Sequence, residues 1–431
     1  MWSPGSATLA YVHAPSAPRD VPLLFATRAV RLFGFGLLSV VLVLYLSAVG
    51  LSEARIGLLL TLTLLGDTAV SLLFTTRADR VGRRRMLLGG AALVVLAGAV
   101  FAVTQSFALL LVAATLGVIS PAGNEVGPFL AIEQAALAQT LPAERRTRVF
   151  ARYSLVGSFA TAAGALTGGA LASGLEHAGW GALGSYRAVV VAYAALGLVL
   201  LALFTRLSPA VEAPGLREPD RRGRPAFLGP DLGLHRSRPV VLKLAGLFTV
   251  DAFAGGFVVQ SFVAYWFHHK FGASPALLGA IFFGANVLAG ISALSAAWVA
   301  SRIGLVRTMV FTHLPSNVLL LAVPLMPTLP LAMAALLLRF SISQMDVPTR
   351  QSYTMAVVDP DERSAAAGVT GIARTVGAAL APVAAGPLYA TAALASVPFF
   401  VAGALKIAYD LALFAAFRAV EPPEERGSPG A

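Results

Sequence analysis

Long apolar runs follow one another along almost the whole sequence, and they constrain the fold more than any other feature. A bilayer core of about 30 Å requires about 20 apolar residues per helix. The runs are rich in Leu, Ala, Val and Gly and are too long for barrel strands, so helices are the only spanning structure available to them. We therefore expect an all-α integral membrane protein with twelve transmembrane helices. The predicted spans are 22–47, 56–76, 86–104, 107–135, 148–172, 187–206, 240–266, 276–300, 308–327, 330–357, 365–389 and 392–418.

The composition excludes the soluble classes of protein. Hydrophobic residues make up 57% of the 431 residues and charged residues only 12%, against about 25% charged residues in a soluble domain. The net charge of +11 is spread in short clusters between the apolar runs, so the expected partner is the lipid bilayer and not nucleic acid. Cysteine is absent, the His268–His269 pair has no third ligand nearby, and no phosphate-binding glycine loop occurs. We expect no cofactor, no metal and no enzymatic activity.

Basic residues are distributed unequally between the connections. Eighteen arginines lie on one side of the predicted membrane, and only Arg55, Arg187 and Lys270 lie on the other. The positive-inside rule then places both termini in the cytoplasm. The first 21 residues lack the pattern of a removed signal peptide. Arginine exceeds lysine and the helices are rich in alanine, which is typical of a GC-rich bacterial genome, so we expect an inner-membrane protein.

The chain divides into two similar halves. A shift of about 220 residues aligns Gly36 with Gly256 and Tyr45 with Tyr265, and it also aligns two copies of an Arg-x-Gly pattern. Parallel repeats of this kind place a binding site near the midplane, between the halves. We predict a cytoplasmic segment (1–21), a six-helix bundle (22–206), a cytoplasmic linker rich in Pro, Gly and Arg (207–239), a second six-helix bundle (240–418) and a cytoplasmic tail (419–431).

The connection after the second run carries the most specific motif. Its sequence from Thr75 to Arg85 is TTRADRVGRRR, which resembles the Gly-x-x-x-Asp-Arg-x-Gly-Arg-Arg signature of the major facilitator superfamily, with threonine at the first glycine. The likeness covers essentially the whole chain. Through Gly34-x-Gly36 and the early arginines Arg28 and Arg31, it is most similar to the twelve-helix drug:proton antiporters. It implies a transporter that works by alternating access, and we expect a monomer.

The resemblance also implies a gate. In this family the loop latches the two halves together in the outward-facing state. By that likeness Asp79, Arg80, Gly82 and Arg83 form the gate, in which Asp79 meets the start of the eleventh helix and Arg83 pairs with Glu133. Gly82 would allow a tight turn. The alternative is that the arginines only determine topology, which is the preferred role for Arg84 and Arg85.

Charged residues inside the runs are the best indicators of a site, because each costs about 2.5–3.5 kcal/mol at a helix centre. Arg31 and Asp251 occupy equivalent positions in the two halves, which predicts an ion pair across the cavity. If Asp251 loses Arg31 as the halves move apart, it would bind a proton. Separate partners for the two residues are the alternative. The candidates for substrate binding and proton coupling are Arg31, Asp67, Glu125, Asp251, Arg339, Asp346 and Arg374.

Other charged positions have simpler interpretations. Glu125 lies between two prolines, which loosen the helix either for ligands and water or only as a polar kink. Asp346 and Arg350 are four residues apart and would pair on one helical face, unless Arg374 competes and leaves Asp346 as a proton site. We assign Lys406 and Asp410 to structure, and His313 is an outside candidate for a titrating group.

These observations predict a secondary active transporter. The first hypothesis is export of small, partly apolar organic compounds in exchange for protons. The alternative is proton-coupled uptake of an organic anion held by Arg31, Arg339 and Arg374. A hypothesis of a different class is a non-transporting receptor or lipid-handling protein on the same scaffold.

Overall fold

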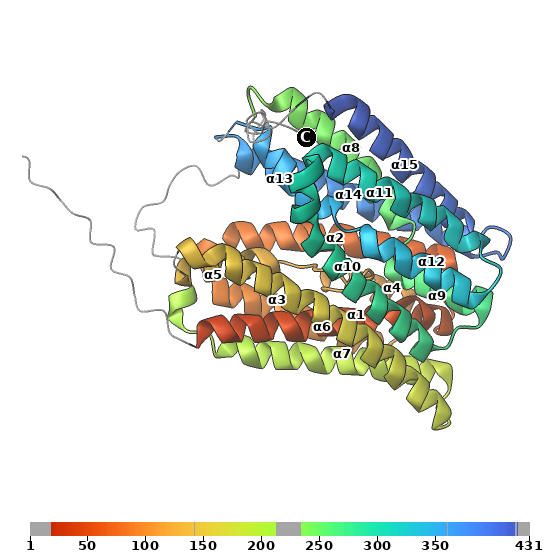
Figure 1. Ribbon diagram of the computed structural model, residues 1–431. Helices are drawn as coiled ribbons and strands as arrows, with labels where there is room; N and C mark the ends of the chain where they lie inside the picture. Colours follow the sequence, from red (N-terminus) through yellow and green to blue (C-terminus); the bar gives the residue numbers. More distant parts are fainter. Residues whose placement is uncertain (1–18, 142, 213–233, 360, 419, 421–431) are drawn as a thin grey trace, which may run out of the picture.

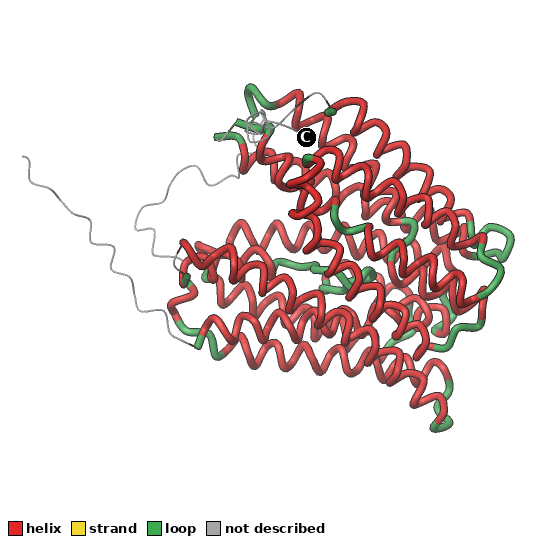
Figure 2. The backbone as a smooth tube through the Cα atoms, in the orientation of Figure 1, coloured by secondary structure: helices red, strands yellow, loops and turns green. Residues whose placement is uncertain are grey.

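The computed structural model describes residues 19–141, 143–212, 234–359, 361–418 and 420. Within these ranges the chain is helical and contains no strand (Figure 2). Most of the predicted N-terminal segment, the central part of the predicted linker and most of the predicted tail lie outside the described residues.

The helices are labelled in Figure 1. In chain order they are α1 (Asp20–Ala48), α2 (Glu53–Val81), α3 (Arg83–Val103), α4 (Phe107–Leu116), α5 (Phe129–Thr140), α6 (Ala143–His177), α7 (Ala182–Thr205), the short η1 (Pro209–Val211), α8 (Arg238–Gly256), α9 (Gln260–Phe271), α10 (Pro275–Ile303), α11 (Leu305–Ala322), the short η3 (Val323–Leu325), α12 (Leu329–Ile342), α13 (Asp346–Ala356), α14 (Arg363–Tyr389) and α15 (Val397–Phe417).

Ten helical segments of the described chain are long and apolar enough to cross a membrane. They correspond to ten of the twelve predicted spans. Three predicted spans are each divided into two helices: 107–135 into α4 and α5, 240–266 into α8 and α9, and 330–357 into α12 and α13. Twelve crossings are therefore compatible with the fold, and three of the twelve spans are interrupted.

Local sequence explains the longest of the three breaks. Between α4 and α5, residues 117–128 contain Pro121 and Pro128, and Gly123 and Gly127 adopt positive φ angles of 71° and 82°. Proline removes a backbone donor and glycine tolerates the left-handed conformation, so the helix stops and restarts across this segment. An irregular backbone at membrane depth is tolerated where protein or a cavity surrounds it.

The helices form two sets that diverge toward one end of the molecule (Figure 1). Helix α1 packs against α6 and α7, and α3 against α7, whereas α8 packs against α14 and α15. The two sets meet mainly where α2 contacts α14 and α6 contacts α10. The sets are most separated at the end where the chain leaves α7 and enters α8, which we call the linker end.

Close backbone contacts join the two sets at the opposite end, which we call the closed end. A Cβ atom built on Gly57 of α2 would overlap the carbonyl oxygen of Pro382 and lie 3.1 Å from the Cα of Gly386, both on α14. Gly169 of α6 approaches Gly279 of α10 in the same way, with a built Cβ 2.9 Å from the Cα of Gly279. Only glycine permits helices to approach so closely.

Hydrogen bonds reinforce the closed end. Val383 donates its backbone N–H to the Thr61 hydroxyl over 2.9 Å, and Ala276 donates to Ser173 Oγ over the same distance. Tyr265 on α9 donates its hydroxyl to Glu53 on α2 over 2.7 Å. The structure is therefore that of a molecule closed at one end and divergent at the other.

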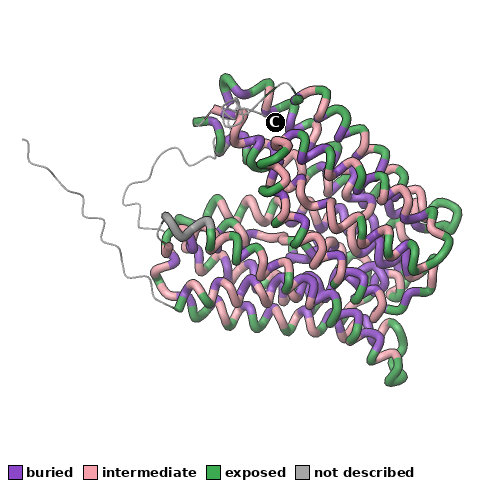
Figure 3. The backbone as a smooth tube through the Cα atoms, in the orientation of Figure 1, coloured by how far each residue is buried: buried purple, intermediate pink, exposed green. Residues whose placement is uncertain are grey.

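Large apolar side chains remain exposed on the outer faces of the helices, and exposed positions recur along the outer helices in Figure 3. Leu96, Leu198, Leu294 and Leu411 each expose more than half of their surface. In a protein that spans a membrane, these side chains face lipid, which removes the cost that water would impose on them.

Candidate functional site

The first half contains a buried cluster of two arginines and two glutamates. Arg31 on α1 donates Nη1 and Nη2 to the two carboxylate oxygens of Glu133 on α5 over 2.9 and 2.7 Å. Its Nε donates to Glu125 Oε1 over 2.8 Å, and Arg28 Nη1 donates to Glu125 Oε2 over 2.6 Å. Two charges of each sign balance one another, which is how ionised side chains are accommodated away from water.

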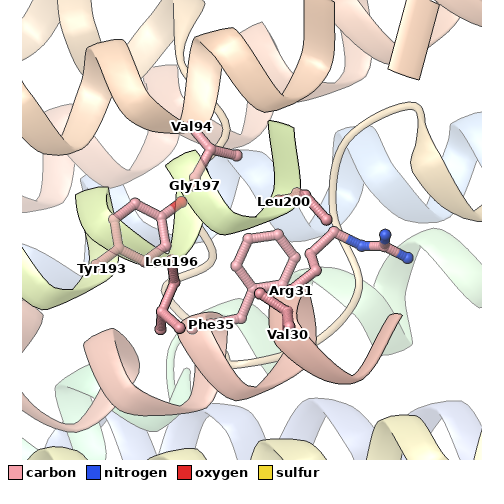
Figure 4. A pocket seen from close by; sticks show the side chains of 9 residues that line it. Val30, Arg31, Phe35, Val94, Tyr193, Leu196, Gly197 and Leu200 are labelled. Atoms are coloured by element: carbon pink, nitrogen blue, oxygen red, sulfur yellow. The ribbon is translucent and has the colours of Figure 1, made fainter. Parts of the chain in front are cut away.

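The position of Arg31 follows from the surroundings of its stem. The aliphatic part lies against Val30, Phe35 and Leu200, and the guanidinium points away from them (Figure 4). The space lined by this stem has a volume of about 10 Å³, which holds no more than about one water molecule. This space is therefore a packing gap and not a substrate site.

The second half contains a second buried cluster, centred on Asp251 of α8. Lys406 Nζ donates to Asp251 Oδ1 over 2.5 Å, and Arg374 Nη1 and Arg350 Nη1 donate to Oδ2 over 3.1 and 3.4 Å. Arg350 also donates to Asp346 Oδ2 over 2.7 Å. The helical pair of Asp346 and Arg350 is thus present, and Arg374 is bound to Asp251 and not to Asp346.

His313 of α11 extends this cluster to the last helix. Its Nδ1 lies 2.8 Å from Asp410 Oδ1, and its Nε2 lies 3.9 Å from Asp251 Oδ1. Asn317 donates to Asp410 Oδ2 over 2.8 Å. Lys406 and Asp410, which the sequence analysis assigns to structure, are therefore parts of the same charged network as Asp251.

The predicted ion pair between Arg31 and Asp251 is not formed in this conformation. Each residue has partners of opposite charge in its own half, which is the alternative stated above. Because Arg31 and Asp251 occupy equivalent positions in the repeat, they lie at equivalent depths in the membrane. The oppositely charged residues that bind each of them, however, belong to its own half. Those counter-charges lie on helices far away in sequence, and a comparison of the two halves does not reveal them.

A cavity of about 190 Å³ lies between the two halves. From the first half it is lined by polar groups of Arg28, Glu125, Ser158 and others, and from the second half by Asn286 and Gln344. The complete lining is Arg28, Leu32, Asn124, Glu125, Gly157, Ser158, Thr161, Asn286, Ala289, Gly290, Ala293 and Gln344. Glu125 therefore belongs both to the arginine cluster and to the wall of the cavity.

The two remaining intramembrane candidates are not members of these ion pairs. Asp67 of α2 is buried and accepts the backbone N–H of Gly127 over 2.6 Å. Arg339 of α12 lies over the ring of Phe340, with 5.0 Å between the guanidinium carbon and the ring centroid. Neither has a partner of opposite charge within 4.0 Å among the described residues, and neither lines the cavity between the halves.

The predicted gate adopts a different pairing. Gly82 has a φ of 112° and separates α2 from α3, as a tight turn requires. Arg83 donates to Asp79 over 2.8 Å and to the side chain of Gln139 over 2.8 Å. The predicted pair of Arg83 with Glu133 is not formed in this conformation, in which Arg31 binds Glu133.

Asp79 remains half-exposed at the linker end, where the two sets of helices diverge. Its predicted contact with the start of the eleventh helix, here α14, is absent from this conformation and stays a prediction for the state in which that end closes. Arg80 makes no ion pair within 4.0 Å among the described residues.

Sequence reasoning missed several residues of this region. Glu212, at the end of the first half, accepts the backbone N–H groups of Arg83 and Arg84 over 2.6 and 3.2 Å and so caps α3. Asn286 and Gln344 were not singled out for the cavity. Both are uncharged amides within apolar spans, and a search for polar as well as charged residues in those spans would have found them.

Metal chemistry has no evident site in the described part of the chain, where no three His, Asp or Glu side chains are grouped so that they could hold a metal ion. The chemical capacities of the region are those of hydrogen bonding and charge pairing. A helical membrane protein with two charged clusters and a cavity between two sets of helices has the features of a membrane transporter.

Comparison with known proteins identifies the family. Residues 24–382 and 252–431 match the Major Facilitator Superfamily. The uncharacterized membrane protein YJR124C of Saccharomyces cerevisiae is 32% identical over 434 residues, which cover 95% of this chain and 97% of that protein. The chain therefore belongs to the Major Facilitator Superfamily.

Solved structures show the same fold at low sequence identity. The nucleoside transporter NupG aligns with a TM-score of 0.72 at 13% identity, covering 93% of this chain and 99% of that one. A bacterial homologue of the iron transporter ferroportin in an inward-facing state aligns with a TM-score of 0.70 at 12% identity, covering 93% and 99%. The family and these neighbours indicate a membrane transporter rather than an enzyme.

Proposed function

We propose that this protein is a proton-coupled secondary transporter that exports small organic compounds by alternating access. The observation that carries the proposal is the cavity of about 190 Å³ lined by residues of both halves. The molecule is closed at one end and divergent at the other. Rocking of the halves around this cavity would expose its contents alternately to the two sides.

The cavity lining supports a small solute with both polar and apolar parts. Glu125, Asn286 and Gln344 offer hydrogen-bonding groups, whereas Leu32 and Ala289 offer apolar surface. The volume is below the lower limit of about 300 Å³ that is typical of pockets for drug-sized ligands. Export remains a prediction from the resemblance to the drug:proton antiporters. The alternative hypothesis, uptake of an organic anion, relies on Arg31, Arg339 and Arg374. Arg31 and Arg374 already form ion pairs with carboxylates of the protein, whereas Arg339 forms none among the described residues.

Proton coupling is supported by the buried carboxylates that accompany the cavity. Glu125 contacts both the cavity and the arginine cluster, so a solute that displaces Arg28 or Arg31 would change which group Glu125 binds. Ionisable groups in membrane spans commonly serve as proton relays. If a proton and a solute compete for the same carboxylate, each is bound only when the other has left. They would therefore cross the membrane in opposite directions.

The test has two stages. The purified protein is first screened for thermal stabilisation by a panel of small organic compounds. The hits are then added to proteoliposomes that contain a pH-sensitive dye. We expect a stabilising compound to drive proton movement, and we expect Glu125→Gln to abolish that movement while the protein still inserts and folds.

A matched control is Ser301→Leu on α10, at an exposed position, which we expect to leave the flux unchanged. Compounds that stabilise the wild-type protein but cause no flux under any imposed gradient would contradict the proposal and favour the receptor hypothesis. Accumulation of the compound together with protons would contradict export and favour uptake.

A further inference from the structure

The side chain of His313 lies between two aspartates deep inside the second half. Its Nδ1 faces Asp410 at 2.8 Å, and its Nε2 faces Asp251 at 3.9 Å. All three side chains expose 5% of their surface or less. A neutral imidazole carries one N–H, so it can donate to only one of the two carboxylates, whereas an imidazolium carries two and can donate to both.

The far side of Asp410 is already satisfied by a neutral partner. Asn317 donates to Asp410 Oδ2 over 2.8 Å, and no lysine or arginine lies within 4.0 Å of Asp410 among the described residues. His313 is thus the only described side chain that can bring a positive charge into contact with Asp410. This arrangement distinguishes Asp410 from Asp346, which is paired with Arg350.

Asp251, in contrast, has an excess of positive partners. Lys406, Arg374 and Arg350 all contact it, at 2.5, 3.1 and 3.4 Å. Arg350 has a second carboxylate in Asp346, and Lys406 is buried. Arg374 exposes 33% of its side chain. It lies on α14, which packs against α2 of the other half. Of the three cations bound to Asp251, Arg374 therefore has the most exposed side chain.

We propose that His313 is a proton-binding residue and that its protonation releases Arg374 from Asp251. The proton adds to the ring nitrogen that carries no hydrogen, no covalent bond is broken, and the hydrogen bond from Arg374 to Asp251 is lost. The imidazolium of His313 then acts as a counter-charge of Asp251 in place of the guanidinium of Arg374, so Arg374 can leave. The link between this proton and solute movement rests on the proposed function, but the titration of His313 does not.

Five helices of the second half carry titratable or charged groups in the network that includes His313. The titratable and charged groups are Asp251 of α8, Arg339 of α12, Asp346 and Arg350 of α13, Arg374 of α14, and Lys406, Tyr409 and Asp410 of α15. The ring of Tyr409 lies edge-on at 6.0 Å from the imidazole. Of these groups, only Asp251 and Asp410 lie within 4.0 Å of a ring nitrogen as acceptors.

The experiment is nuclear magnetic resonance of the full-length protein in lipid, with ¹⁵N-labelled histidine and arginine. The chain has six histidines, so the His313 signals are assigned by their loss in His313→Gln. We expect the ring of His313 to change from one protonated nitrogen to two between pH 8 and pH 5. We expect the guanidinium signals of Arg374, assigned through Arg374→Lys, to change over the same pH interval.

Two outcomes would overturn the inference. A His313 ring that keeps one protonation state from pH 8 to pH 5 contradicts proton binding. An Arg374 signal that stays constant while His313 titrates contradicts the release step. Asp410→Asn, which keeps the size of the side chain, should abolish the His313 change, and Asp361→Asn at the exposed linker end should preserve it. If His313 titrates but the protein shows no proton flux, the proposed transport function is contradicted, whereas the proposal that His313 binds a proton still holds.

Discussion

Glu133 and Arg31 form a bidentate ion pair in which neither side chain has any exposed surface. Two hydrogen bonds of 2.9 and 2.7 Å join them, and Thr27 donates a third to Glu133 over 2.7 Å. The pair links α1 to the second part of the broken fourth span. It therefore fixes the position of the irregular segment 117–128, from which Glu125 reaches the cavity.

Glu133→Ala should destabilise the protein strongly. The substitution leaves Arg31 with only Glu125 as a counter-charge, and removing one partner of a buried pair typically costs about 3–5 kcal/mol. Thermal unfolding in detergent measures the effect. The control is Asp361→Asn, whose ion pair with Arg236 is largely exposed and is expected to contribute less than about 1 kcal/mol. Equal small effects of the two substitutions would show that the Arg31 pair does not stabilise the fold.

Gly57→Leu should open the closed end. A side chain at this position would meet the backbone of Pro382 and Gly386 on α14, so α2 and α14 must separate. Because the chain has no cysteine, spin labels can be introduced at chosen pairs and the distance across the closed end measured directly. Gly174→Leu, at a position with nothing within 4 Å of the built Cβ, should leave the distance unchanged. The same distance in both variants would contradict the contact.

Asn286→Leu should abolish transport without unfolding the protein. The amide of Asn286 lines the cavity from the second half and donates to Gln260 over 3.4 Å, so its loss removes a hydrogen-bonding group from the solute site. The readout is solute-driven proton movement in proteoliposomes, with thermal stability measured in parallel. Retention of full flux would show that the solute does not contact this wall of the cavity.

Acid should weaken the contact between Glu362 and the segment that precedes α8. Burial raises the pKa of Glu362, but hydrogen bonds from the backbone N–H groups of Ser237, His235 and Arg236 lower it, to about 2 from an ordinary value of 4.5. A carboxyl group whose pKa is lower in the folded protein than in the unfolded chain stabilises the fold at pH values above its ordinary pKa. This stabilisation is lost as the pH falls from about 4.5 toward 2.

Unfolding temperatures measured between pH 6 and pH 3 test this expectation. The wild-type protein should lose stability over the lower part of this range. Glu362→Gln should be less stable at pH 6 and should depend less on pH. Asp361→Asn, an exposed neighbour, serves as the control. An identical pH dependence in Glu362→Gln and the wild-type protein would exclude Glu362 as the source.

The sequence predicts the overall fold well because each transmembrane span carries its own signal in about 20 consecutive residues. Ten of the spans correspond to helical segments that are long and apolar enough to cross a membrane. The prolines and glycines around Glu125 indicate a loosened helix, but the extent of the break depends on the tertiary contacts that hold it. The Asp346–Arg350 pair was predictable because both residues lie on one helix, four positions apart.

The arrangement of charges between helices was not predictable in the same way. Arg31 binds Glu133, which is 102 positions away, and Lys406 binds Asp251 across 155 positions. Nothing in a single sequence specifies which of several intramembrane charges meet. The repeat relates Arg31 and Asp251 as equivalent positions, which does not specify the partners of either residue in this conformation. His313 could be noticed as a titratable side chain in a span, but its two carboxylate partners come from α8 and α15.

The most direct test of the central claim is a pair of distance measurements on the cysteine-free chain in lipid. One pair of spin labels spans the closed end, and the other spans the linker end. Both are measured at pH 8 and pH 5 with and without a stabilising compound from the screen. Proton-coupled alternating access predicts that the linker-end distance decreases as the closed-end distance increases, with populations that depend on both pH and compound. Distances that stay constant at both ends under all four conditions would contradict it.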